Sequence, residues 1–210
     1  MLTLVIDSAT DACSVALFDD NRLIAGDHRL LGRGHAEALV PMISQLPGKG
    51  RADRIAVSLG PGSFTGTRVG LAAARALALA WQCELVGYPT LALVAAQADL
   101  AQPLTVCMTG GHGEWFVQDF NGDSTPASPL ASMRPDDAAA FAQHPCVVGS
   151  QAEALVALRG HGRAVVLLPD ARAFQSLPDS ALTSAATPLY GRAPDAKLPG
   201  GGQTTPGTMP

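Results

Sequence analysis

The order of apolar segments constrains this chain more than any other feature, because that order occurs twice. Three strand-like runs come first, near residues 2–7, 13–18 and 22–28, and helices alternate with strands over residues 34–100. Alternating apolar residues indicate the strands, and apolar residues at helical spacing indicate the helices. A weaker version of the same order begins at residue 104. A meander followed by alternating helices and strands, appearing twice, predicts an α/β protein with two similar lobes.

The lobe boundaries follow from this repetition. We expect a first lobe over residues 1–100 and a smaller, divergent second lobe over residues 101–197. Residues 198–210 are dominated by Gly, Pro and Thr, which predicts a disordered tail because little there can be buried. The N-terminus lacks the basic start and long apolar core of a signal peptide. The most apolar stretch, 69–81, is shorter than a membrane span, so we expect a cytoplasmic protein without membrane contact.

Composition limits what the chain does by itself. Its formal charge is -4, and no stretch is rich in Lys or Arg. A protein that holds nucleic acid alone usually presents a basic face, so any contact with nucleic acid is expected to come through another chain. The four cysteines lack C-x-x-C spacing, which argues against a disulfide framework or a zinc site. His35 has Leu39, not a second histidine, four residues later, so we predict no metal site on that helix.

The first candidate site is the turn that follows the first strand. Asp7 ends the strand, and the hydroxyl residues Ser8 and Thr10 follow it. A carboxylate and hydroxyls in a turn are able to hold magnesium and phosphate groups. In the simpler interpretation, which we favour, Asp7 and Thr10 bond to the backbone of their own turn. A phosphate-binding loop normally contains more glycine than this one.

The second candidate is a glycine-rich loop between a strand and a helix. It is not a P-loop, because the Gly-Lys-Ser/Thr ending is missing. Helix N-termini bind anions well, but glycines also serve sharp turns, and Ser63 or Thr65 is suited to cap the helix. We favour a structural role for this loop over anion binding. The structural residues predicted here are Gly60, Pro61, Gly62, Ser63, Thr65 and Arg68.

The third candidate is a stripe of small residues on the helix predicted over 65–82. Gly66, Gly70, Ala74 and Ala78 recur every four residues and form a smooth surface for close helix packing. The helix is apolar nearly all round, which indicates burial on more than one side. Two interpretations stay open: the kinked helix over 34–46 covers the second side, or another molecule does.

These motifs together resemble the bacterial TsaB (YeaZ) family. The similarity rests on residues 7–17, 34–37 and 60–68, and returns briefly at Pro188-Leu189-Tyr190-Gly191-Arg192. It implies the actin/hexokinase-like fold, built from two ribonuclease-H-like lobes. It also implies a non-catalytic subunit that binds TsaD, the enzyme that places threonylcarbamoyl on the adenosine 3′ of the tRNA anticodon. The other expected partners are the ATPase TsaE, TsaC through the adenylate it makes, and tRNA through the complex.

The resemblance also implies where partners bind. Family dimers use the first two helices, so we predict a heterodimer with TsaD there, and homodimers when the chain is alone. The chain itself is expected to need no cofactor, while ATP and magnesium in the complex or in a vestigial site stay open. The residues predicted for the interface are His35, Leu39, Met42, Gly66, Gly70, Ala74 and Ala78.

Two enzymatic alternatives to this scaffold role make different demands on the sequence. A small-molecule kinase or ATPase of the same fold needs a complete phosphate site in both lobes, and the second lobe offers only Thr109–Gly113 without an acidic residue matching Asp7. The family's usual Asp-Ala-Arg is also missing there, although Glu114 follows. A metallopeptidase would need a bound metal, for which no ligand set was found in the sequence.

Overall fold

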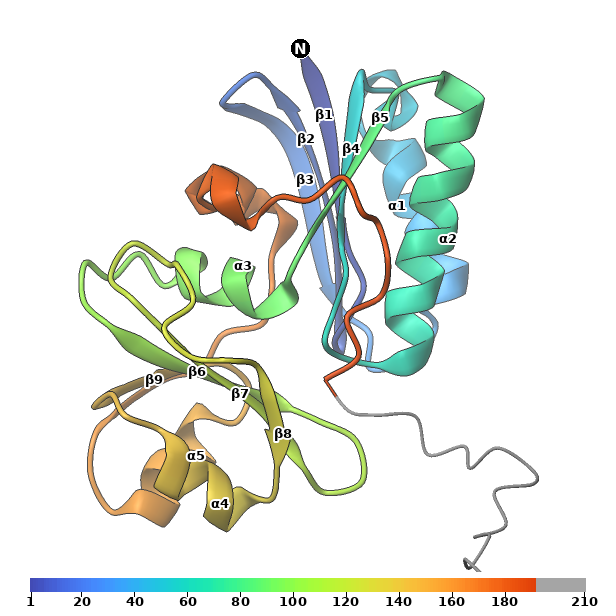
Figure 1. Cartoon of the computed structure of the whole chain (residues 1–210). Helices are drawn as coiled ribbons and strands as arrows, with labels where there is room; N and C mark the ends of the chain where they lie inside the picture. Colours follow the sequence, from blue (N-terminus) through green and yellow to red (C-terminus); the bar gives the residue numbers. More distant parts are fainter. Residues whose placement is uncertain (192–210) are drawn as a thin grey trace, which may run out of the picture.

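A computed structural model gives the fold of the chain and describes residues 1–191. Two β-sheets, each with helices packed against it, form two lobes joined through one central helix (Figure 1). The predicted tail, 198–210, and Arg192 lie outside the described residues.

The elements follow the predicted order in both lobes. The first lobe contains β1 (Leu2–Asp7), β2 (Ala12–Asp19), β3 (Arg22–Leu30), α1 (His35–Gln45), η1 (Pro47–Gly50), β4 (Arg54–Ser58), α2 (Phe64–Trp81), β5 (Glu84–Tyr88) and α3 (Thr90–Gln97). The second contains β6 (Leu104–Thr109), β7 (Trp115–Phe120), β8 (Ala131–Met133), α4 (Pro135–Phe141), β9 (Cys146–Val148), α5 (Ala152–Arg159) and β10 (Arg163–Val165). Two short 3₁₀ helices follow, η2 (Ala171–Ser176) and η3 (Asp179–Ala181).

The two sheets have the same topology. The first runs β3-β2-β1-β4-β5, and the second runs β8-β7-β6-β9-β10 when read from the equivalent edge. In each, the three meander strands pair antiparallel and the last two strands pair parallel. This repetition confirms the predicted fold class, a duplicated ribonuclease-H-like arrangement of the actin/hexokinase-like type.

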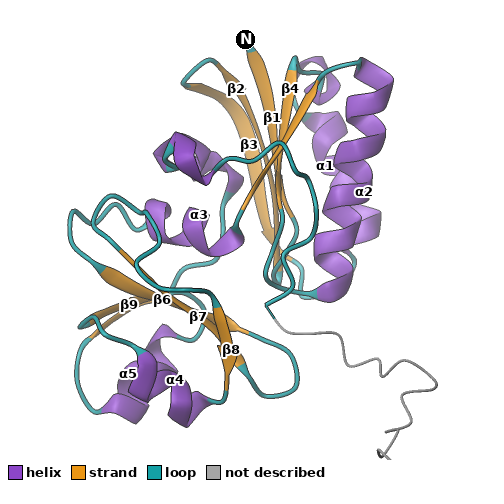
Figure 2. Cartoon of the chain, viewed as in Figure 1, coloured by secondary structure: helices purple, strands orange, loops and turns teal. Residues whose placement is uncertain are grey.

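Side-chain alternation along β1 divides the first sheet into two faces. Leu4 and Ile6 pack in the cluster that includes α1 and α2, whereas Val5 packs on the opposite face with residues of α3 and η2. Successive side chains of a strand point to opposite faces, so both faces of this strand are covered. Figure 2 shows α1 and α2 together on one side of the sheet and α3 on the other.

Helix α3 joins the lobes because it packs against both sheets, which buries it on all sides. All seven residues from Thr90 to Ala96 are buried. Leu93 packs against the first sheet, while Leu91 and Val94 pack with Val106 of the second. A helix that is apolar all round belongs in an interior, so the two sheets share α3 as common core.

After β10 the chain returns to the first lobe, which the sequence did not predict. Phe174 of η2 packs against Phe18 and Tyr88, with ring centroids 6.2 and 5.7 Å apart. The Ala171 amide donates to the Ser14 hydroxyl at 2.9 Å. Further along, Thr183 forms a bridge with Gly87 at the end of the first sheet. The predicted second lobe, 101–197, therefore supplies part of the core of the first lobe.

Element boundaries agree with the predictions to within a few residues. Helix α1, His35–Gln45, lies within the range predicted over 34–46, and α2, Phe64–Trp81, matches the helix predicted over 65–82. Pro41 lies inside α1. Over residues 1–191, no helix combines the length and apolar character needed to cross a membrane.

The returning segment generates a stability prediction. Phe174→Ala removes a ring that is only 4% exposed, so we expect it to lower the free energy of unfolding by about 3–5 kcal/mol. Phe64→Ala, which truncates a ring that is 60% exposed, should cost less than about 1 kcal/mol. Urea unfolding of both variants measures the difference, and equal costs would contradict the packing described for η2.

Candidate functional site

A cleft of about 640 Å³ opens between the lobes. The β1–β2 turn and the start of α2 form its wall on the first lobe. The β6–β7 turn forms its wall on the second. Residues Leu189–Gly191, from the end of the described chain, close it from the side. Apolar side chains dominate the lining, with Phe64, Met108, Phe116 and Tyr190 as the largest.

The predicted phosphate loop turns its polar groups inward. Asp7 is 1% exposed, and its carboxylate accepts from the Ala9 amide at 3.0 Å. Ser8 is 2% exposed and donates to the Gly66 carbonyl at 2.9 Å. The Thr10 hydroxyl accepts from the Ala12 amide at 3.3 Å. These bonds match the interpretation that the turn satisfies its own backbone.

Burial also changes the acidity of Asp7. Loss of water around the carboxyl raises its pKa from 3.8 to about 6, and hydrogen bonds from Ala9, Ser58 and Tyr88 oppose this effect. The Tyr88 hydroxyl lies 3.1 Å from the Ile6 carbonyl and 3.5 Å from the Asp7 carboxylate. Asp7 therefore belongs to a buried polar group beneath the cleft and does not line it.

The glycine-rich loop packs directly on this turn. A Cβ atom on Gly62 would overlap the Ala9 carbonyl, and one on Gly66 would overlap the Ser8 carbonyl. The Ser63 amide donates to the Ala9 carbonyl at 2.6 Å, and the Ser63 hydroxyl caps α2 by accepting from the Gly66 amide. Glycine is required here because two backbones meet with no room for a side chain.

The other loop residues hold the end of the described chain. Gly60 has φ of +88° and precedes a cis bond to Pro61. Arg68 stacks on Phe64, with 3.5 Å from its guanidinium carbon to the ring centroid, and donates to the Tyr190 hydroxyl at 3.1 Å. Thr65 is exposed, and Ser63, not Thr65, caps the helix. The glycine-rich loop and the Pro188–Arg192 motif, far apart in sequence, thus meet through Tyr190.

The second-lobe wall also uses its polar groups within the chain. The Thr109 amide donates to the Ser150 hydroxyl at 2.9 Å, and the Gly110 amide donates to the Glu114 carbonyl at 2.9 Å. The Glu114 carboxylate accepts from Ser132 at 2.7 Å, which ties it to β8. Within residues 1–191, no three His, Cys, Asp or Glu side chains gather in a way that could hold a metal ion.

Five backbone amides around the cleft already donate to groups of the chain itself. The amides of Ala9, Ser63 and Gly66 donate to acceptors within the first lobe. Thr109 and Gly110 do the same in the second lobe. A phosphate cradle needs such amides directed at the ligand.

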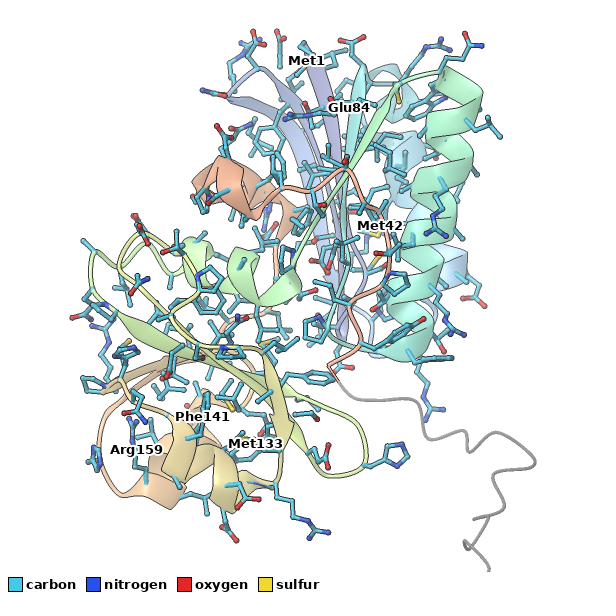
Figure 3. All side chains as sticks on the ribbon, in the orientation of Figure 1. Met1, Met42, Glu84, Met133, Phe141 and Arg159 are labelled. Carbon is cyan, nitrogen blue, oxygen red and sulfur yellow. The ribbon has the colours of Figure 1, made fainter. Side chains whose placement is uncertain are left out.

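The structure corrects the predicted partner interface. The small residues of α2 face their own sheet: a Cβ on Gly70 would lie 3.7 Å from Ile6 and Val57 side chains. His35 donates from Nε2 to the Thr10 carbonyl at 2.8 Å, since a carbonyl only accepts. Figure 3 places Met42 between the first sheet and the helices. All seven predicted interface residues are buried in the chain: His35, Leu39, Met42, Gly66, Gly70, Ala74 and Ala78.

The outward surface of the same two helices carries exposed apolar side chains beside the charged Glu37, Arg68 and Arg75. Leu79 is 83% exposed and Val40 is 59% exposed. We call this surface the outer α1/α2 face and define it by its exposed apolar residues Ala36, Val40, Ala72, Ala76 and Leu79. On α2 these positions lie opposite the glycine stripe, which faces the sheet.

The acidity of Asp7 predicts how stability depends on pH. Because the folded-state pKa lies above the unfolded value, this group favours folding most below pH 3.8, and that contribution is lost as pH rises through about 6. The difference between 3.8 and about 6 corresponds to roughly 3 kcal/mol.

Asp7→Asn should remove this pH-dependent contribution to the free energy of unfolding. We expect the variant to gain stability relative to the parent at pH 7 but not at pH 4, as measured by urea unfolding. Asp11→Asn, at an exposed position in the same turn, is the matched control. An unchanged pH dependence in Asp7→Asn would show that this carboxyl titrates normally.

Comparisons with known proteins agree with this architecture. The family model of TsaD, tRNA N6-adenosine threonylcarbamoyltransferase, matches residues 29–160, more than half of the chain. The TsaB protein of Escherichia coli K12 is 39% identical over 103 residues, 47% of this chain and 44% of that protein. A tRNA N6-adenosine threonylcarbamoyltransferase of Anaeromyxobacter is 30% identical over 166 residues, 66% of this chain and 49% of that protein.

The similarity to a solved structure extends over nearly the whole fold. YeaZ from Pseudomonas aeruginosa superposes with a TM-score of 0.75 at 26% identity, covering 90% of this chain and 99% of that chain. The matches to the curated relatives, in contrast, span less than half of those proteins. The chain belongs to the family of the TsaD model, and its TsaB relatives and YeaZ neighbours assign it to the TsaB (YeaZ) members of that family.

Proposed function

We propose that this chain is a non-catalytic scaffold subunit that binds TsaD through the outer α1/α2 face in the synthesis of threonylcarbamoyladenosine in tRNA. The observation that carries the proposal is the exposed apolar character of this face, above all Leu79 at 83%. Apolar patches of this kind on folded proteins favour association. The relatives named TsaB carry this biosynthetic role in their name.

The state of the interlobe cleft supports a role without catalysis. The two turns that line it form hydrogen bonds within their own lobes. Asp7, the acidic residue that a kinase-type phosphate site would use in the first lobe, is buried beneath them. The TsaD partner would supply the chemistry. TsaE as a further partner, TsaC as the source of the adenylate, and a cytoplasmic location remain predictions from the resemblance.

Contact with tRNA is proposed only through the complex. The formal charge of -4 gives the chain no general attraction to a polyanion. A homodimer through the same outer α1/α2 face is the expected state of the chain alone, because the face is exposed until a partner covers it.

Charged substitutions on the outer α1/α2 face test the proposal. We expect Leu79→Glu to weaken TsaD binding at least about tenfold, because it places a carboxylate in an apolar contact. Because Leu79 is exposed, the fold should tolerate the change. Leu158→Glu, on α5 at a residue 51% exposed, is the control that should bind normally. Calorimetry or a pull-down with TsaD from the same organism measures both.

A second comparison separates the two faces of α2. Ala74→Leu overpacks a fully buried site, so it should lower stability by about 1–3 kcal/mol and affect binding only through the fold. If Leu79→Glu bound TsaD as tightly as the parent, this face would not be the interface. If the tRNA modification persisted after deletion of the gene, the scaffold role itself would be wrong.

The alternative, a small-molecule kinase or ATPase, has one observation in its favour, the 640 Å³ cleft between the lobes. Five amides around the cleft, those of Ala9, Ser63, Gly66, Thr109 and Gly110, donate within the chain. We therefore expect calorimetry with ATP and Mg²⁺ to give no Kd tighter than about 1 mM. Tight, saturable binding or phosphoryl transfer by the purified chain would favour the kinase instead.

A further inference from the structure

The segment that returns from the second lobe passes beside α2, and we call its part over residues 183–191 the strap. Figure 1 shows the strap in red, running alongside α2 toward the interlobe cleft. It starts at the bridge between Thr183 and Gly87 on the first sheet. Residues 189–191 then close the cleft from the side. The strap therefore lies against both the proposed partner-binding helix and the cleft.

Two arginines of α2 hold the strap. Arg75 donates to the Ala186 carbonyl at 2.6 Å, and Arg68 donates to the Tyr190 hydroxyl at 3.1 Å. Both arginines are exposed, and both bonds lie at the surface. An exposed hydrogen bond adds little net stability, because water replaces either partner when the bond breaks. These two bonds are therefore the part of the attachment that another molecule is able to displace.

The far end of the strap connects the two lobes. A Cβ atom on Gly191 would lie 2.5 Å from the Phe116 ring and 3.3 Å from Pro61. Phe116 belongs to β7 of the second lobe, and Pro61 belongs to the glycine-rich loop of the first. Close by, the Leu189 amide donates to the Leu59 carbonyl at 2.7 Å. Release of the strap would therefore open the cleft on this side.

The same two arginines give the outer α1/α2 face its positive charge. Arg68 and Arg75 share one stripe of α2 with the exposed Leu79, because positions four and seven apart lie on one side of a helix. Glu37 is the one acidic residue of the two helices. Within residues 1–191, neither arginine forms an ion pair with Glu37 or another carboxylate. Their acceptors are an uncharged carbonyl and a hydroxyl, and a carboxylate binds a guanidinium group more strongly than either.

We propose that partner binding on the outer α1/α2 face releases the strap, because carboxylates of the partner take Arg68 and Arg75 from it. Seven residues of helix separate the two arginines by about 10 Å, so the partner presents two acidic groups at this spacing beside an apolar patch that covers Leu79. The outer face and the cleft are then coupled, since the same side chains are used differently in the two states. The inference rests on the proposed function, because TsaD is the partner it concerns.

Hydrogen exchange of the full chain, alone and in complex with TsaD from the same organism, tests the release. The Leu189 amide, which is bonded to Leu59 in the free chain, should exchange at least about tenfold faster in the complex. The Thr183 amide, which donates to the Gly87 carbonyl at 3.0 Å, is the internal control and should keep its rate. Unchanged or slower exchange of the Leu189 amide in the complex would overturn the proposal.

Four variants at exposed positions separate this coupling from a simple contact. Arg68→Met and Arg75→Met should each weaken TsaD binding about tenfold, because each removes a donor to a carboxylate. Tyr190→Phe removes only the hydroxyl that competes for Arg68, so it should tighten TsaD binding about threefold. Arg163→Met, on β10 of the second lobe, removes the same charge elsewhere and should bind like the parent.

The outcomes distinguish this inference from the proposed function. If TsaD bound the parent chain but bound Tyr190→Phe equally or more weakly, the strap would not compete with the partner, and this inference alone would fail. Unchanged binding by Arg68→Met or Arg75→Met would likewise remove the acidic partner surface. Absence of any TsaD binding to the parent chain would overturn the proposed function and this inference together.

Discussion

The contact on which this structure depends is the one between two backbones at the base of the interlobe cleft. The loop before α2 and its first turn rest directly on the β1–β2 turn, where Gly62 and Gly66 leave no room for a Cβ. The Ser63 amide and the Ser8 hydroxyl bond across this contact. The contact fixes α2 on the sheet and uses the Ser63 amide, one of the donors that a phosphate site at this helix start would require.

The same contact explains why the two sides of α2 differ in the size of their side chains. Small residues are needed on the inner side because the helix lies so close to β1 and β4, and Ala74 is accordingly fully buried. The outer side has no such steric demand, yet it carries Leu79 and a row of alanines. Alanine favours the helix itself, whereas the exposed Leu79 is the residue that the proposed association with another chain would cover.

The sequence predicted the elements and the duplicated topology because each strand and helix has its own apolar periodicity. It also indicated that the glycine-rich loop is structural. It could not tell the inward stripe of α2 from the outward one, because both consist of small or apolar residues and only the position of β1 distinguishes them. The return of Phe174 to the first lobe was missed as well, since a short 3₁₀ segment has no periodic pattern and its partners, Phe18 and Tyr88, are distant in sequence.

That return links parts of the first lobe that lie far apart. Within a single segment, Phe174 and Asp179 line a cavity of about 260 Å³ at the start of β1, while Leu189 and Tyr190 line the interlobe cleft beyond its end. Between them, the bridge from Thr183 to Gly87 fastens the segment to the sheet, and Arg75 of α2 donates to the Ala186 carbonyl at 2.6 Å. Helix α2 therefore contacts the sheet on one side and this segment along another. Its remaining outward side is the part of the helix that is free to meet a second protein.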